Sequence, residues 1–219
     1  EAGGFMIRYL ITFNRSKQTE DEMLRLYDEL LALDIGEIVG VDLAGDEINY
    51  PPELFQRFFA RVRSDGRYRS TIHAGEVTPP TQVWEAIRML GADRIGHGTS
   101  AIQDAELQSY LKDHTIVLEQ CITSNYQTGS WVDEANHPLG ALYRSGVPVT
   151  INSDDPFIQD TELTDDYVKA VHYFGFSLDD LIRLNEIAIA GAFLPDDERR
   201  GLLRTFRKAA NEFRRSHPI

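Results

Sequence analysis

The 219-residue chain has one cysteine, no long apolar run and fewer basic than acidic residues. A single cysteine, Cys121, excludes an internal disulfide and is compatible with a reducing cytoplasm; we expect it to be a small buried residue on a strand. The 22 Lys and Arg residues against 35 Asp and Glu residues give a formal net charge of −13. That charge argues against nucleic acid or an anionic membrane as a main partner. No apolar stretch approaches the roughly 20 residues that a membrane span needs, so we predict a cytoplasmic protein.

The composition, 42% hydrophobic and 26% charged, is ordinary for a folded globular chain of this length. We therefore predict a single domain over residues 1–219. The chain opens at Glu1 without an initiator Met and enters a strand-like run, Phe5 to Phe13, within a few residues. We interpret this as a chain that begins partway through a domain, truncated at its amino terminus.

Strand-like and helical segments alternate along the chain. Runs rich in β-branched and aromatic residues predict six strands, which end near Phe13, Leu43, His73, His97, Glu119 and Asn152. Between them, apolar residues recur at helical spacing. From Asp165 onward the pattern is helical to the end, with breaks near Gly175 and Pro195.

Alternation of this kind builds a parallel sheet with right-handed crossovers. An open doubly wound sheet and part of an eight-stranded barrel both satisfy it. A doubly wound nucleotide binder normally carries a Gly-rich phosphate loop after its first strand, whereas the first strand here continues into Asn14-Arg15-Ser16-Lys17. We therefore predict an α/β fold, a (β/α)8 TIM barrel present as roughly its last six βα units plus carboxyl-terminal helices.

Four expected strand ends deliver polar residues, namely Gly45-Asp46-Glu47, His73 with Glu76, His97, and Asp154-Asp155. In a barrel the carboxyl ends of the strands meet at one mouth, where chemistry is done. His and Asp are natural zinc ligands, and zinc lowers the pKa of bound water to about 7. Glu76 then stands within reach as a proton donor, and His97 is placed to hold or deprotonate the water.

Each of these segments also has a plainer interpretation. Asp154-Asp155-Pro156 is a common turn or helix cap, and Asp46-Glu47 is typical of a solvated loop. A His at a strand end, such as His73, is usually only a hydrogen-bonded residue. His97 differs because glycines flank it on both sides, which indicates a close approach of the backbone to another group. We assign no chemistry to the remaining histidines, His114, His137, His172 and His217.

Five motifs, taken together, resemble the successive motifs of the adenosine deaminase family. In chain order they are Asp42-Leu43-Ala44-Gly45-Asp46-Glu47, His73-Ala74-Gly75-Glu76, Ile95-Gly96-His97-Gly98, Cys121-Ile122-Thr123-Ser124-Asn125 and Asn152-Ser153-Asp154-Asp155-Pro156. The resemblance covers nearly the whole chain and is specific as a set. It implies a zinc-dependent (β/α)8 barrel that hydrolyses the 6-amino group of a purine nucleoside, converting adenosine to inosine plus ammonia.

The resemblance also implies roles for individual residues. His73 and Asp154 would be zinc ligands, with Asp154 at the catalytic centre. Glu76 would protonate ring N1 as hydroxide attacks C6, and His97 would orient and help deprotonate the attacking water.

Substrate contacts follow from the same resemblance. Asp155 would hydrogen-bond the purine at N7, and the backbone at Gly45 would meet N3. Tyr126 and Trp131 either shape one side of the pocket or simply pack in a long loop.

The sequence departs from the family pattern at one point. The family's first strand carries a His-x-His pair that supplies two more zinc ligands, but the first histidine here is His73. The first strand of this chain corresponds to the family's third. Two protein ligands fall short of the three or four of a zinc site, so we expect the two further His ligands from a missing amino-terminal part. The chain alone is expected to bind zinc weakly or not at all, with negligible turnover.

Other functions remain open at this point. Adenine or aminodeoxyfutalosine would suit the same motifs as adenosine. A non-catalytic barrel relative, or a fragment that binds nucleoside without turnover, fits the absent His pair but not the retained catalytic residues. A metal-dependent hydrolase of an ester or cyclic amide would not need a proton donor placed like Glu76. The sequence does not determine the oligomeric state.

Overall fold

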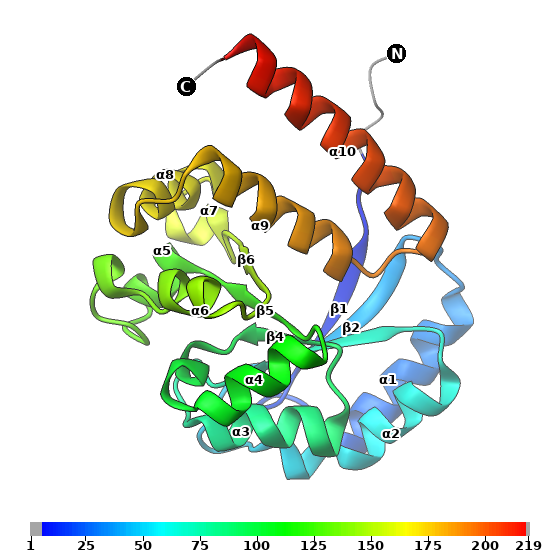
Figure 1. Ribbon diagram of the computed structural model, residues 1–219. Coiled ribbons are helices and arrows are strands. Elements are labelled where there is room, and N and C mark those ends of the chain that lie inside the picture. Colours follow the sequence, from blue (N-terminus) through cyan, green and yellow to red (C-terminus); the bar gives the residue numbers. More distant parts are fainter. Residues whose placement is uncertain (1–5, 218–219) are drawn as a thin grey trace. The chain divides into compact units, whose positions relative to one another are not determined.

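The structure, a computed structural model, describes residues 6–217 (Figure 1). The chain forms two compact units, Glu1–Gln103 (unit 1) and Asp104–Ile219 (unit 2). In both units parallel strands alternate with helices, which confirms the predicted α/β fold with six strands. The single domain over residues 1–219 stays a prediction. Among residues 6–217, no helix combines the length and apolarity that crossing a membrane requires.

Unit 1 contains four parallel strands in chain order, with three α-helices and three short turns of 3-10 or π-helix. Its elements are β1 (Tyr9–Asn14), α1 (Glu20–Leu33), β2 (Ile38–Ala44), η1 (Pro52–Phe55), α2 (Gln56–Asp65), β3 (Arg69–Ala74), α3 (Pro80–Glu85), η2 (Ala86–Leu90), β4 (Arg94–His97) and η3 (Thr99–Gln103).

The strand register of unit 1 separates an apolar from a polar face. Phe13 pairs with Leu43, Leu43 with Ile72, and Ile72 with Ile95, so these four buried side chains form one row across the sheet. Because side chains alternate along a strand, the residues on either side of this row point to the opposite face. That face carries polar residues, including Thr12, Asp42, Thr71 and His73.

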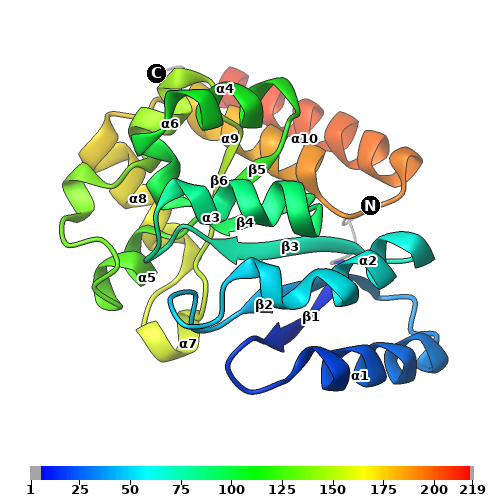
Figure 2. The same ribbon diagram turned by 90° about the horizontal axis from the view of Figure 1, so that it is seen from below.

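Helices α1 and α2 cover the apolar face of these strands. In Figure 2, α1 runs along β1, and α2 lies beside β2 and β3. The Phe58 ring of α2 packs against Phe13 of β1 with ring centroids 4.6 Å apart. Helix α1 begins at a capping box formed by Thr19 and Glu22, and its C-cap residue, Asp34, adopts the left-handed conformation.

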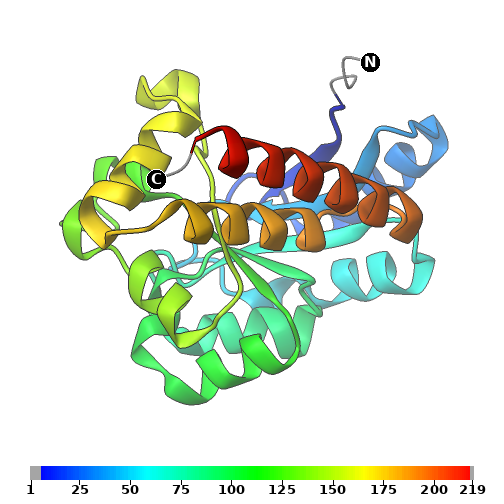
Figure 3. The same ribbon diagram turned by 45° about the horizontal axis from the view of Figure 1, so that its top comes forward.

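Unit 2 contains two parallel strands and the carboxyl-terminal helices. Its elements are α4 (Ala105–Asp113), β5 (Val117–Gln120), α5 (Ile122–Gln127), η4 (Glu134–Asn136), α6 (Leu139–Ser145), β6 (Val149–Ile151), α7 (Pro156–Gln159), α8 (Leu163–Phe174), α9 (Leu178–Gly191) and α10 (Asp196–Ser216). Leu118 pairs with Val149 and Gln120 with Ile151. Helices α9 and α10 lie side by side (Figure 3), and Arg207 of α10 is 2.6 Å from Glu186 of α9.

Two local expectations need correction. The first strand begins at Tyr9, and Met6 and Ile7 precede it as exposed residues, whereas Phe5 lies outside the described residues. Cys121 is buried, as predicted, but it follows β5 and precedes helix α5, so its placement on a strand is wrong. Helix α5 was not predicted, because its six residues are too few to show an apolar period.

Candidate active site

Polar residues gather at the carboxyl edge of the unit 1 sheet. Strands β2, β3 and β4 are parallel, and Leu43 pairs with Ile72 while His73 pairs with Gly96. The residues that close these strands therefore lie at one edge, which in parallel α/β folds is the functional edge. The predicted gathering of these strand ends holds for the part of the site that unit 1 supplies.

A buried carboxylate orients His73. The Nδ1 atom of His73 lies 2.9 Å from Oδ1 of Asp42, and Oδ2 of the same carboxylate accepts a hydrogen bond of 3.1 Å from the Thr12 hydroxyl. A carboxylate at Nδ1 favours the tautomer with the proton on that nitrogen, so Nε2 becomes the nitrogen that coordinates a metal. This donor arrangement fits zinc, and the sequence reasoning did not identify Asp42 as its supporting residue.

The glycine before His97 leaves room for the His73 ring. A Cβ atom built on Gly96 would lie 2.8 Å from Nδ1 and 2.9 Å from Cγ of His73. Any side chain at position 96 would therefore displace the imidazole. The close backbone approach that the flanking glycines indicated is thus an approach to His73.

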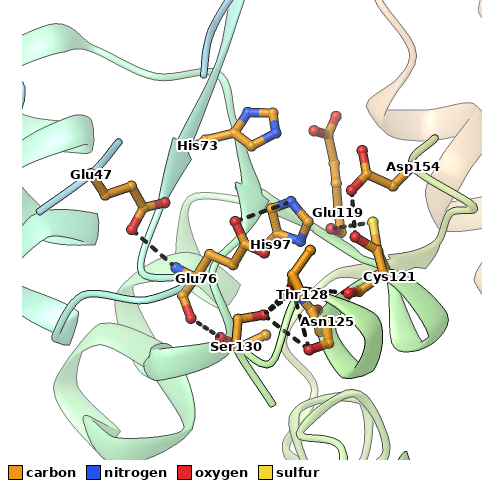
Figure 4. Close-up of polar contacts among 12 residues, drawn as sticks. Glu47, His73, Glu76, His97, Glu119, Cys121, Asn125, Thr128, Ser130 and Asp154 are labelled. Atoms are coloured by element: carbon orange, nitrogen blue, oxygen red, sulfur yellow. Dashed lines mark hydrogen bonds and ion pairs between the residues drawn. The ribbon is translucent and has the colours of Figure 1, made fainter. Parts of the chain in front are cut away.

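His97 and Glu76 face each other in unit 1. His97 is only 3% exposed and adopts a left-handed backbone conformation with φ of +56°, which is uncommon for a residue other than glycine. Its Nε2 lies 3.7 Å from Oε2 of Glu76, and its ring centroid is 5.1 Å from that of His73 (Figure 4). Backbone strain of this kind is concentrated at functional sites. The structure therefore brings the predicted proton donor, the predicted water-holding residue and the predicted metal ligand together.

Glu47 holds the segment that carries Glu76. Its Oε2 accepts hydrogen bonds from the Glu76 backbone N–H at 3.2 Å and from the Thr78 hydroxyl at 2.6 Å. Glu47 is 2% exposed, so the interpretation of Asp46-Glu47 as a solvated loop is wrong for Glu47. The signal that pointed to it was its place directly after a strand end, three residues beyond Ala44.

Two glycines shape the turns beside these side chains. Gly75 has φ of +73°, and a Cβ there would lie 2.4 Å from the Ser100 hydroxyl and 2.5 Å from a Val83 methyl. Gly45, which follows β2, has φ of +107° and an exposed backbone. Both positions therefore require glycine, and the predicted contact of Gly45 with substrate stays a prediction.

Unit 2 places Asp154 three residues beyond the end of β6. Its φ is +57°, again left-handed, and its Oδ2 accepts a hydrogen bond of 2.6 Å from the Ser124 hydroxyl of α5. A metal-binding carboxylate is usually hydrogen-bonded in this way, which fits the predicted role. Asp155 occupies the N-cap position of α7 without making a side-chain cap hydrogen bond, so capping does not account for its carboxylate.

The segment after β5 contains buried polar residues whose partners the sequence did not predict. The Thr123 N–H and hydroxyl both donate to Oδ1 of Asp166, at 3.0 and 2.7 Å. Asn125 Oδ1 lies 3.0 Å from Nε2 of His137, which is buried. Burial raises the pKa of Asp166, while its hydrogen bonds from Thr123 lower it in part. No sequence motif marked Asp166, because its partner lies 43 positions away.

The chain is similar to known deaminases in sequence. The family model described as adenosine deaminase matches residues 1–209. The adenosine deaminase of Yersinia pseudotuberculosis serotype IB (strain PB1/+) is 42% identical over 183 residues, which cover 84% of this chain and 54% of that protein. The chain thus spans about half the length of the curated relatives that it matches.

The fold of this chain is also similar to the folds of several solved structures. The adenine deaminase of Arthrobacter aurescens matches 93% of this chain and 62% of its own with a TM-score of 0.86 and 29% identity. An amidohydrolase from Burkholderia ambifaria with bound zinc matches 95% and 58% with a TM-score of 0.88 and 26% identity. An Arabidopsis protein in complex with IMP matches 94% and 59% with a TM-score of 0.83 and 26% identity. These matches support the predicted barrel fold over part of its length, and with the family model they show that the chain belongs to the adenosine deaminase family.

Proposed function

We propose that the protein hydrolyses the 6-amino group of a purine nucleoside, with adenosine as the first substrate to test. The observation that carries this proposal is the arrangement in unit 1, where Asp42 orients His73 and the Glu76–His97 pair lies beside it. Membership of the adenosine deaminase family supports the same reaction.

In this proposal His73 and Asp154 hold a zinc ion. Each already has an orienting partner, Asp42 for the imidazole and Ser124 for the carboxylate. Zinc, when bound, lowers the pKa of water enough to supply hydroxide near neutral pH. Two ligands do not complete a zinc site, so the activity is proposed for the polypeptide that carries the family's full ligand set.

The protein side chains then move protons and orient the substrate. His97 holds the attacking water and takes its proton, while Glu76 protonates ring N1 so that C6 accepts the hydroxyl group. The C6–N bond then breaks, ammonia leaves with the proton that His97 took from water, the C6 hydroxyl group returns its proton to Glu76, and the 6-oxo purine remains. Asp155 hydrogen-bonds N7, and the Gly45 backbone N–H donates to N3.

A screen of ammonia release tests the reaction and its substrate. Adenosine, adenine, aminodeoxyfutalosine, AMP and N6-methyl-AMP should be compared, because solved relatives include an adenine deaminase and an N6-methyl-AMP deaminase. We expect adenosine to give the highest kcat/KM. A preference for the free base or for a nucleotide would move the substrate assignment, and no turnover of any purine by zinc-loaded protein would favour a non-catalytic binder.

The Glu76→Gln substitution separates chemistry from binding. Glutamine keeps the shape of the side chain but cannot donate the proton, so we expect kcat to fall by about 10²- to 10⁴-fold with nucleoside binding retained. Glu85→Gln is the matched control, since Glu85 lies in the same unit at the end of α3 and not at a strand end. An unchanged rate in the Glu76 variant would show that Glu76 is a bystander.

A further inference from the structure

Arg15 is a buried cation directly beyond the carboxyl end of β1. Its side chain is only 1% exposed, which is rare for arginine because taking a charge out of water is costly. It is among the largest fully buried side chains of the described residues. A charge buried at the functional edge of the sheet requires a reason.

The guanidinium group of Arg15 donates to carbonyl groups of the neighbouring chain segments. Its Nη2 lies 2.5 Å from the carbonyl oxygen of His73 and 3.2 Å from that of Leu43, and its Nη1 lies 3.4 Å from that of Tyr50. The β2–β3 pairing extends to Leu43 and Ile72, so Arg15 joins the two strands at the point where their ladder ends. The rigid fork of a guanidinium group suits two such acceptors better than the single ammonium of lysine does.

The charge of Arg15 is balanced by the acids that support the candidate active site. Burial lowers the pKa of Arg15, and the carboxylates of Glu47, Asp42 and Asp46 raise it. Asp42 orients His73, and Glu47 holds the backbone of Glu76. The same cation therefore contacts the His73 backbone and balances the carboxylates that place His73 and Glu76.

We propose that Arg15 is a positioning residue for His73, fixing the backbone at the end of β3 so that the imidazole keeps its place between Asp42 and the metal. This inference rests on the proposed function of His73 as a metal ligand. It predicts that the geometry of His73 depends on a residue 58 positions away that touches neither metal nor purine.

Three variants test this role. Arg15→Met removes the charge and the donors but keeps the length of the side chain, and Arg15→Lys keeps the charge but not the fork. Arg63→Met is the matched control, because Arg63 also donates to a carbonyl in unit 1, that of Leu90 at the end of η2, away from the strand ends that carry the site. Thermal unfolding of all variants measures the purely structural cost.

Zinc affinity and the split between kcat and KM measure the positioning effect in the full-length enzyme. We expect Arg15→Met to lower zinc affinity and kcat by about 10- to 100-fold while KM changes little, with Arg15→Lys in between. Arg63→Met should change neither. Equal effects of Arg15→Met and Arg63→Met on zinc affinity would overturn the proposal, and if Arg15→Met fails to fold, a wild-type zinc affinity and kcat in Arg15→Lys would do the same.

The ¹⁵N NMR signals of the His73 imidazole give a readout that needs neither metal nor turnover. In the parent protein we expect one tautomer with the proton on Nδ1, held by Asp42. Loss of that single state in Arg15→Lys supports the proposal, and its retention in both Arg15 variants overturns it. A parent protein that turns over no purine would refute the proposed function, while the NMR comparison would still decide the role of Arg15.

Discussion

Each unit contains a buried ionisable side chain that hydrogen-bonds neighbouring backbone groups. In unit 1 the Arg15 guanidinium donates to the carbonyls of Leu43 and His73 at strand ends. In unit 2 the Asp166 carboxylate, fully buried, accepts from the N–H and hydroxyl of Thr123 in the first turn of α5. The type of side chain, a donor in unit 1 and an acceptor in unit 2, follows from the backbone groups present, because the carboxyl ends of strands offer acceptors and the first turn of a helix offers donors.

The two units also differ in how their candidate metal ligands, His73 and Asp154, are held. The backbone of His73, and through it the imidazole, is held by a cation, whereas Asp154 is held by Ser124, which follows Thr123 on α5. Lys169 donates to the Thr123 hydroxyl at 2.7 Å and to Glu134 at 2.5 Å, so the buried acid has a cation nearby. The position of a candidate metal ligand at a strand end thus depends on the side chain that hydrogen-bonds the neighbouring backbone.

The largest expected effect is on stability in unit 2. Asp166→Ala leaves the Thr123 N–H buried without an acceptor, so the free energy of unfolding should fall by about 2 to 3 kcal/mol. Asp166→Asn is the control, because its amide oxygen still accepts from Thr123, and it should lose under about 1 kcal/mol. Chemical denaturation measures both. Equal losses of unfolding free energy in the two variants would show that the hydrogen bonds from Thr123 to Asp166 do not stabilise the fold.

A second comparison concerns the supports of the two candidate ligands. Asp42→Asn removes the charge behind His73 and should lower zinc affinity of the enzyme by about 10- to 100-fold. Ser124→Ala should cost at most about 10-fold, because Asp154 is exposed and water can replace the hydroxyl. Chelator competition measures both affinities. A larger loss in Ser124→Ala than in Asp42→Asn would reverse the comparison.

The smallest expected effect is a pH dependence from Asp166. Burial raises the pKa of this carboxyl in the folded protein above its ordinary value, opposed in part by Thr123 and Lys169 and aided by Glu134. Folding therefore favours its protonated form, so the stability that it contributes is complete below the ordinary carboxyl range and is lost as pH rises through the raised pKa. Unfolding free energies measured upward from pH 4 should fall more steeply in the parent than in Asp166→Asn. Parallel curves would contradict this assignment.

The local pattern of apolar and polar residues was sufficient to predict most of the fold. Runs of β-branched and aromatic residues predicted the six strands, and apolar residues at helical spacing predicted the helices between them. Helix α5 escaped prediction because its buried polar residues, such as Thr123, are stabilised by partners on α8. A short segment that is stabilised in part by tertiary hydrogen bonds has no apolar period to reveal it.

The candidate site likewise contains residues that the sequence predicted and residues that only the structure revealed. His73, Glu76 and His97 were predicted from their places at strand ends, and the structure brings them together in unit 1. Glu47 was named among the polar strand ends but was also interpreted as part of a solvated loop, and Arg15 was assigned no role, because a loop acid and a basic residue after a strand are usually solvated. Only the tertiary structure shows that both side chains are buried.

The sequence by itself determined the alternation of strands and helices, the polar strand ends and the family to which the chain belongs. These properties depend on residue type and short-range spacing, which a linear chain displays directly. Only the tertiary structure decided which partners orient the chemical groups: Asp42 for His73, Glu47 for the Glu76 backbone, and Arg15 for the end of β3. The physical reason is that a buried charge or hydrogen-bonding group is stabilised by atoms close in space, and those atoms come from residues about 30 to 60 positions away in the chain.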